Sequence, residues 1–308
     1  FQGHNMWAAK NPSFGATFTL HLKDVPASLK SERQKKEKEL EKDKKDVLYP
    51  SFDQLKEEQL DEHAQLIWII SDEKGNEIRR MVSDAQKGVV RQQWNLRKTS
   101  TNPIGRGGQG TLVVPGSYYL RVVMVHNGEV DELVGKTSFM VKGLNNQTLV
   151  AQDQPALNAF RGSVAELNRK VSGSQMLYSD LNEGLILIEK AVLNYPNTDL
   201  QILKEIRELK LTKAQLKEQL YGDELRAKYE FESAPSFTSR LGLLEYQLSE
   251  NTTAVSATHR ATLQMVEKEY GQFKELLAAY QKRIEELQRT LEKSNIPYTK
   301  YRLNWKED

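Results

Sequence analysis

Apolar residues recur at alternating steps of four and three along two stretches of this 308-residue chain. Such spacing places one apolar seam along a helix, and the seam needs a partner helix to cover it. The first seam runs through Phe160, Val164, Leu167, Val171, Tyr178, Leu181, Leu185, Ile188 and Val192. The second seam runs through Leu263, Val266, Tyr270, Phe273, Leu277, Tyr280, Ile284, Leu287 and Leu291. The second half of the chain is therefore predicted to be a helical bundle.

The pattern predicts four helices within residues 156–294, joined in an up-down-up-down antiparallel bundle with long coiled-coil-like helices. The first should end before Pro196, and Asn197 or Thr198 should cap the second. The third should begin at Ser236 and the fourth should span Ser256 to Ser294. The first and fourth are the longest, so their ends are expected either to project as a two-helix stalk or to be covered. The covering segments would be the loop 221–236 and an aromatic tail, 295–308, that packs back.

Period-two alternation replaces the helical pattern in residues 16–142. Ala16–Leu22 alternates as a half-buried strand does, and Asn127-Gly128 is a strong hairpin signal. About seven short strands, one of them Thr111–Val114, predict an antiparallel sandwich of immunoglobulin-like (Ig-like) type with Trp94 at its centre. Residues 143–155 should be the linker to the helical bundle.

A charged insertion at 29–63 interrupts the predicted strands. In Lys30–Asp46, 14 of 17 residues are charged, eight basic and six acidic. Mixed charge at helical spacing predicts a solvated helix, and Ser51 or Asp53 is placed to cap a second short helix. The insertion is interpreted as a surface arm, and a partner-binding arm is the alternative.

Three segments carry a resemblance to a known family. Residues 4–19, with Asn11-Pro12-x-Phe14-Gly15-Ala16, resemble the junction that follows the β-propeller in bacterial sortilin-like proteins with neuraminidase (BNR) repeats. Residues 72–97 and 115–121 resemble the Ig-like domain of the flagellar hook-capping protein. Family members usually carry Trp-Asp where this chain has Trp94-Asn95, so no role of that acid is carried over.

The resemblance implies that residues 1–15 lead from an upstream propeller that is missing here. It implies a non-catalytic, structural, extracytoplasmic (periplasmic, cell-surface or secreted) region that binds its own propeller, and other proteins through the bundle or the arm. Two alternatives stay open: an accessory region of a sialidase-like propeller glycoside hydrolase, and a coiled-coil adaptor inside the cell. The chain opens on Phe1-Gln2-Gly3, so a fragment is expected, and these three residues are either native or vector-derived.

Composition argues against several kinds of chemistry. There is no cysteine, and the five histidines have no metal-ligand spacing, so no catalytic residue, cofactor or metal ligand is assigned. A net charge of +2 gives no field for nucleic acid, and no apolar run reaches the ~20 residues of a membrane helix. Gly105–Gly110 is interpreted as a mobile loop. The candidate partner contacts are Trp7, Tyr178, Tyr280 and Trp305.

Overall fold

The computed structural model describes residues 9, 11, 13–102, 109–144, 149, 151–196, 198–294, 296, 297 and 299–301. It combines antiparallel β-sheets with several helices in two compact units. The first unit comprises Phe1–Thr99 and Leu112–Asn145, and the second comprises Ser100–Thr111 and Asn146–Asp308. The sequence placed residues 100–111 in the sandwich, but the described ones, 100–102 and 109–111, fall in the second unit, where the Asn168 amide donates to Thr101 Oγ1 at 3.0 Å.

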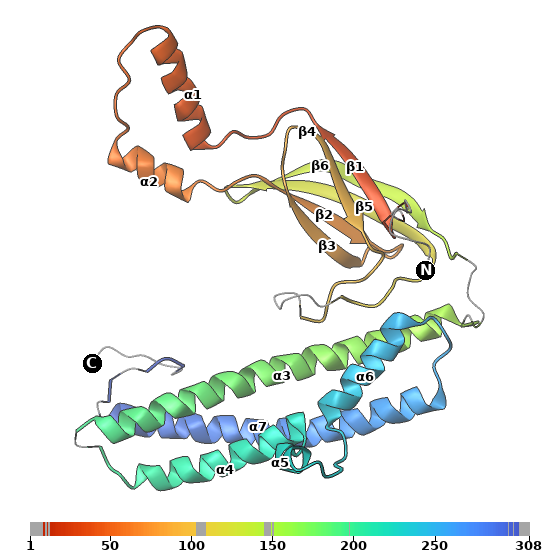
Figure 1. The fold of residues 1–308 in the computed structure, drawn as a ribbon, viewed down its shortest axis with the longest axis vertical. Helices are drawn as coiled ribbons and strands as arrows, with labels where there is room; N and C mark the ends of the chain where they lie inside the picture. The colour runs from red at the N-terminus through yellow and green to blue at the C-terminus, as the bar shows by residue number, and fades with distance from the viewer. Residues whose placement is uncertain are drawn as a thin grey trace, which may run out of the picture. The chain divides into compact units, whose positions relative to one another are not determined.

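The first unit has two antiparallel sheets (Figure 1). The named strands are β1 (Ala16–Leu22), β2 (Gln65–Ser71), β3 (Glu77–Asp84), β4 (Gly88–Trp94), β5 (Gly116–His126) and β6 (Glu129–Val141). One sheet has the order β1-β4, and the other has the order β3-β2-β5-β6. Asn127 and Gly128 both have positive φ in the β5–β6 hairpin, as the sequence predicts.

The expected strand at 111–114 is not formed. Within this segment only Leu112 joins a ladder, through an isolated bridge to Arg97, and Val113 donates its backbone N–H to the Leu96 carbonyl. Pro115 follows directly and has no N–H to donate to a ladder, so pairing cannot continue past it. The described residues therefore contain six named strands instead of about seven.

Both sheets contribute to one hydrophobic core. Trp94 of β4 is fully buried, as predicted, and packs edge-on against Tyr118 of β5 with ring centroids 5.8 Å apart. Phe18 of β1 stacks on Trp68 of β2 at 6.4 Å. Both indoles find a hydrogen-bond acceptor: Trp94 Nε1 donates to the Arg97 carbonyl, and Trp68 Nε1 donates to Ser83 Oγ. Burial of these large rings contributes to holding the two sheets together.

Gly15 is required by the way the chain enters β1. Its φ is +124°, a conformation that favours glycine, and a Cβ built there would lie 2.0 Å from the carbonyl oxygen of Trp94. Any side chain at this position would push β1 away from β4.

Two short helices form the arm between β1 and β2. They are α1 (Leu29–Lys42) and α2 (Phe52–Leu60), and neither contains a buried residue. Ser28 caps α1, and Ser51 caps α2 in a capping box with Gln54. The sequence predicted both helices and named Ser51 as a possible cap.

The second unit is helical. Its elements are α3 (Gln154–Asn194), α4 (Ile202–Tyr221), α5 (Glu224–Lys228), α6 (Phe237–Glu250) and α7 (Ala257–Lys293). Ser236 and Ser256 cap α6 and α7, at the residues where the sequence places the starts of these helices. Gly222 follows the last residue of α4 as its C-cap. The predicted cap of α4 is wrong at Thr198: the N-cap position is Gln201, without a side-chain bond, and Thr198 Oγ1 donates back to the Tyr195 carbonyl. Asn197 lies outside the described residues.

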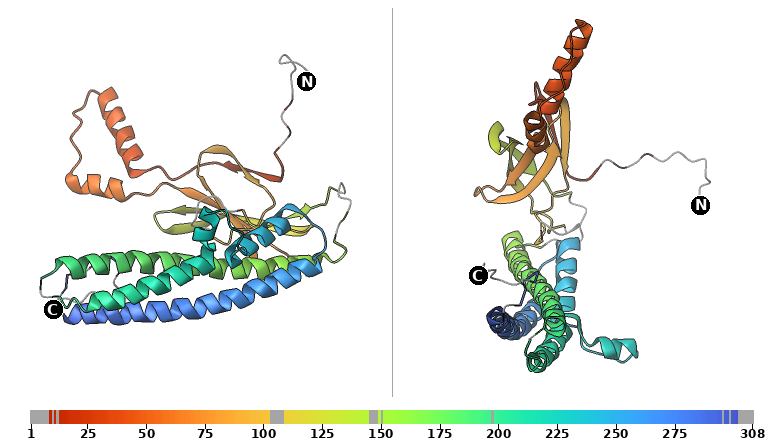
Figure 2. Two further views of the ribbon diagram at one scale, coloured as in Figure 1. Left: turned by 60° about the horizontal axis from the view of Figure 1, so that its bottom comes forward. Right: turned by 90° about the vertical axis from the view of Figure 1, so that its left-hand side faces the viewer.

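The two long helices run parallel. Tyr280 donates to Asn182, and Tyr270 lies within hydrogen-bond distance of Ser174 and of the Lys170 carbonyl, so α7 follows α3 with an offset of 96 to 100 residues. Residues of α4 and then α6 meet successively earlier positions of α3: Lys210 pairs with Glu189, Tyr178 donates to the Lys213 carbonyl, and Asn168 donates to Glu245. Both α4 and α6 therefore run opposite to α3 (Figure 2).

This arrangement corrects the predicted up-down-up-down bundle. Helices α4 and α6 are two pieces of one return path, interrupted at 222–236, so each level of the unit contains α3, α7 and one of the two. The two-helix stalk, one of the two outcomes that the sequence left open, is also absent from the described residues. The seam residues of α3 from Leu157 to Val192 and those of α7 from Leu263 to Leu291 lie in one continuous core. A 20-residue and a 14-residue helix together cover what neither could cover alone.

Arg161 joins the start of α3 to the end of α6. Its side chain is only 2% exposed. Its Nε donates to the Leu248 carbonyl at 3.1 Å, and its Nη2 donates to the Asn251 carbonyl at 2.6 Å. A cation here satisfies carbonyls that a helix end leaves without partners, and it lies at the negative end of the helix dipole.

We expect Arg161→Met to destabilise the helical unit. The buried carbonyls of Leu248 and Asn251 would lose their donor, which costs about 2–3 kcal/mol of unfolding free energy. Urea denaturation followed by circular dichroism at 222 nm measures the loss. The control is Arg169→Met, because Arg169 is an exposed residue of the same helix paired with Glu166, and its loss should cost at most ~1 kcal/mol. Equal losses in the two variants would contradict the role given to Arg161.

Candidate functional site

The four aromatic residues proposed as partner contacts have different outcomes. Trp7 and Trp305 lie outside the described residues. Tyr178 and Tyr280 are in the interior of the helical unit, 6% and 0% exposed. Neither side chain can therefore make the expected contact with another protein. The reason is that both rings belong to the core that α3, α4 and α7 share, and the Lys213 carbonyl of α4 accepts from the Tyr178 hydroxyl.

Tyr178 and Tyr280 instead form a polar layer within the apolar core. The Tyr280 hydroxyl donates to Asn182 Oδ1 at 3.0 Å, and the Tyr178 hydroxyl donates to the Lys213 carbonyl at 3.1 Å. Burial raises the pKa of both phenols, so both remain neutral donors. A buried polar layer of this kind fixes the register of helices, and it is structural.

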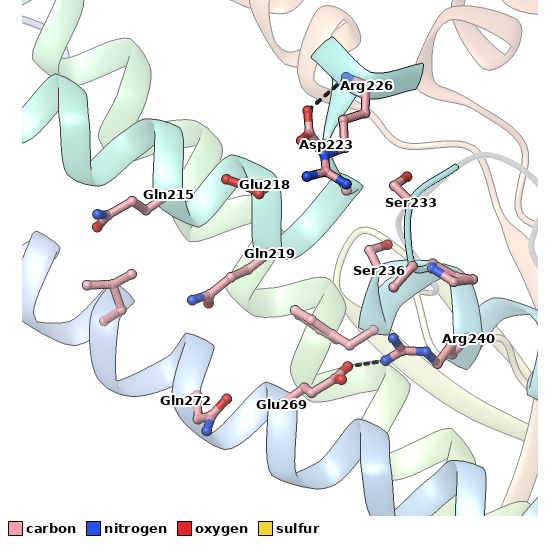
Figure 3. Close-up of a pocket in the computed structure, with 15 residues that line it drawn as sticks. Gln215, Glu218, Gln219, Asp223, Arg226, Ser233, Ser236, Arg240, Glu269 and Gln272 are labelled. Carbon is pink, nitrogen blue, oxygen red and sulfur yellow. Dashed lines mark hydrogen bonds and ion pairs between the residues drawn. The ribbon is translucent and has the colours of Figure 1, made fainter. Parts of the chain in front are cut away.

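A pocket of about 690 Å³ lies at the interruption between α4 and α6 (Figure 3). Gly222, with φ +83°, ends α4 there, and α5 and the segment Ser233–Ser236 detour around the opening. Thr238 Oγ1 donates to the Leu220 carbonyl and holds the start of α6 to the end of α4. Phe237 and Leu276 supply apolar lining.

Apart from Gly222, Ala234 and Pro235, the remaining lining of this pocket is polar, and its two arginines pair with its own carboxylates. Arg240 forms an ion pair with Glu269, and Arg226 pairs with Asp223 at 3.3 Å. Asp223 also caps α5 by accepting from the backbone of Leu225 and Arg226. Gln219 from α4 and Gln272 from α7 present amides beside these pairs (Figure 3). The polar groups of the pocket could form hydrogen bonds with a ligand. Ser236 Oγ, however, already lies within hydrogen-bond distance of Thr238 Oγ1 and Ser239 Oγ.

The arm is held at its base by a latch around Asp61. This carboxylate accepts the Leu29 N–H at 2.8 Å and the Asn127 amide at 2.9 Å, and Asn127 Oδ1 accepts the Glu62 N–H at 2.8 Å. These hydrogen bonds, first that from Asn127, lower the pKa of Asp61, and His126 lies 3.7 Å away. The latch joins both ends of the insertion to the β5–β6 turn. The sequence did not reveal this role of Asn127, because the Asn-Gly signal predicts only the turn.

A second link joins the two helices of the arm. The Arg33 guanidinium donates to both carboxylate oxygens of Glu58, at 2.5 and 2.9 Å, and to Glu37 at 2.6 Å. The hydrogen bond from Arg33 lowers the pKa of Glu58, so the pair stays ionised. Bidentate geometry fixes the angle between α1 and α2 without a hydrophobic core.

The connection between α1 and α2 and the first residue of α2 expose large apolar side chains. Leu48 and Tyr49 are each 84% exposed, and Phe52 is 80% exposed. We call these three residues the arm tip. None of the three belongs to the hydrophobic core of the first unit.

Metal and membrane features were also sought in the described part of the chain. No group of three or more His, Asp or Glu side chains there could hold a metal ion. No helix in the same residues is long and apolar enough to span a bilayer. His21 faces outward on β1, and His259 caps α7 with Ser256. The Gly105–Gly110 loop lies mostly outside the described residues.

Comparison of this chain with protein-family models, with curated proteins and with solved structures finds no match.

Glu245 is the acidic group that burial perturbs within α6. It is half-buried against α3, and desolvation raises its pKa although the Asn168 amide donates to its Oε2 at 2.8 Å. The second hydrogen of the same amide is donated to Thr101 Oγ1, so Asn168 offers Glu245 a single hydrogen bond. Ionised Glu245 is thus less well accommodated than the neutral acid.

We expect Glu245→Gln to stabilise the helical unit at pH 7. A carboxyl whose folded-state pKa is raised contributes its stability when protonated and loses it as the pH rises through that pKa, and glutamine avoids this loss. The gain should vanish below about pH 4, where the acid is protonated in both states. Urea midpoints at several pH values measure it. The exposed Glu267→Gln serves as control, and a gain that did not depend on pH would contradict the explanation.

Proposed function

We propose that this chain is a non-catalytic interaction module that binds another protein through the arm tip. The observation that carries the proposal is the exposure of Leu48, Tyr49 and Phe52 at the end of two helices that bury nothing of their own. A soluble fold has no reason to extend such side chains into water, and apolar groups gathered on a surface usually mark a binding site.

The arm is also preorganised for binding. The Asp61 latch holds the base of the arm, and the Arg33–Glu58 pair fixes the angle between α1 and α2. Little conformational entropy is therefore lost when the tip is bound. Rigid aromatic anchors surrounded by polar groups are typical of interface hot spots. The charged residues of α1 carry both signs, which fits a protein socket with an apolar floor and a mixed-charge rim.

We also propose that the β unit is an Ig-like sandwich. Three features support this. The strand order β3-β2-β5-β6 matches the C′-C-F-G sheet of such domains, and Trp68 is buried on β2, the equivalent of strand C. The Tyr118 hydroxyl, near the start of β5, donates to the Val114 carbonyl four residues upstream at 2.6 Å, as in a tyrosine corner.

The origin of the chain is part of the same proposal. We infer a region that follows a sortilin-like propeller in an exported bacterial protein, with that propeller as a further partner. The support is the sequence motif before β1, whose Gly15 has a steric reason to be glycine. A coiled-coil adaptor would need an exposed apolar seam, whereas the seams of α3 and α7 are buried together. No observation favours the accessory role in a glycoside hydrolase.

The test places a photo-crosslinking amino acid at Tyr49 in cells that make the protein naturally. We expect one defined adduct with another protein, identified by mass spectrometry, and at least a fivefold loss of that adduct when Leu48→Ser and Phe52→Ser are added. The control position is Lys38, exposed on α1 away from the tip, which should not give this adduct.

Folding is checked separately with the triple variant Leu48→Ser, Tyr49→Ser, Phe52→Ser. Because these side chains are exposed, its unfolding free energy should stay within about 0.5 kcal/mol of the wild type for each substitution. Crosslinking only within the chain, or a stability loss of several kcal/mol, would show that the tip packs on its own protein and would refute the proposal.

A further inference from the structure

A second cleft, of about 530 Å³, opens between β3 and β4 in the first unit. Its lining consists of Arg79–Val82 from β3 together with Gln92, Gln93 and Asn95 from β4 and the residues after it. The two strands follow each other in the chain but belong to different sheets. The cleft is therefore an opening between the sheets and is separate from the arm tip.

Both strands that border the cleft are edge strands. β3 pairs only with β2, and β4 pairs only with β1, among the strands that the structure describes. An edge strand presents backbone N–H and C=O groups that can pair with an added segment. The cleft thus combines a side-chain surface with main-chain groups suited to an extended peptide.

The chemistry of the lining is one-sided. Two guanidinium groups and three primary amides line the cleft, and none of its lining residues is acidic. Arg80 is partly neutralised, because its Nε donates to Glu77 at 2.7 Å. Arg79 has no carboxylate partner in any ion pair of the described residues, and its Nη1 makes one long bond, 3.3 Å, to the Lys98 carbonyl.

Arg79 Nε is the decisive atom. It is buried, and no described residue accepts a hydrogen bond from it. A buried N–H of a charged group without an acceptor costs free energy, so such an atom calls for a ligand. A carboxylate is the anion whose two oxygens match the planar fork of a guanidinium.

We propose that the cleft between β3 and β4 receives an acidic side chain of an extended segment from another protein, with Arg79 binding its carboxylate. The Asn95 amide can donate a further hydrogen bond, whereas the Gln92 amide already donates to Met81 Sδ and to the Gln93 carbonyl. The carbonyl of Ile78 on β3 already accepts the Thr99 N–H, so the backbone of the segment would pair with β3 beyond Ile78 and with β4. Met81 and Val82 lie beside them and favour a segment in which apolar residues flank the acid.

The probes are two five-residue peptides of alternating threonine and valine, one with glutamate and one with glutamine at the centre, and free glutarate as a third ligand. Each is titrated into the full chain labelled with ¹⁵N, and the backbone amide shifts of residues 79–82 and 92–95 are followed. We expect the glutamate peptide to bind at least tenfold more tightly than the glutamine peptide, with saturable shifts at these residues.

The variants are Arg79→Gln, Arg80→Gln and, as the matched control, Arg91→Gln, an exposed arginine of β4 that does not line the cleft. Arg79→Gln should abolish the tenfold preference, Arg80→Gln should reduce it, and Arg91→Gln should preserve it. Native amide spectra of each variant in the absence of ligand show that it is folded, and if Arg79→Gln is not, Arg80→Gln still provides the test.

The other outcomes overturn the proposal in distinct ways. If glutarate binds as tightly as the glutamate peptide at the same residues, the site takes free small carboxylates and no peptide segment. If the two peptides bind equally, or Arg79→Gln and Arg91→Gln have the same effect, the cleft does not recognise a carboxylate.

Discussion

The apolar seams of α3 and α7 have to be covered along their whole length, and most of the helical unit follows from this requirement. The two helices, 41 and 37 residues long, pack in parallel with a nearly constant offset. The chain returns between them in two pieces, so α4 covers one part of the groove and α6 covers the next. The interruption between the pieces leaves the polar pocket lined by Gln219, Arg240 and Glu269.

Isolated polar groups give this core its order. Arg161 holds the last carbonyls of α6 against the start of α3, and Asn182 holds the Tyr280 hydroxyl near the other end. The arm of the first unit uses polar groups in a different way. It has no core, so polar contacts such as the Asp61 latch and the Arg33–Glu58 pair set its geometry, and its apolar residues remain exposed.

Local signals in the sequence predicted most elements. Seam periodicity, the caps Ser236 and Ser256, and the Asn127-Gly128 turn each depend on neighbouring residues, and each appears in the structure. The direction of α6 could not be predicted. An apolar seam indicates that a helix packs against a partner, but it does not indicate whether that partner runs parallel or antiparallel. The cleft at Arg79 and the latch at Asp61 join residues far apart in the chain, so no spacing reveals them.

The parallel arrangement of α3 and α7 can be measured by the distance between nitroxide labels at Lys190 and Arg289. The chain has no cysteine, so Lys190→Cys with Arg289→Cys gives two specific labelling sites. Because 190 lies about level with 288 under the observed offset, pulsed electron resonance should give a narrow distance distribution near or below ~20 Å. An antiparallel arrangement would separate the sites by about 32 residues of helix, roughly 48 Å at 1.5 Å per residue. A distance of that size would contradict the account.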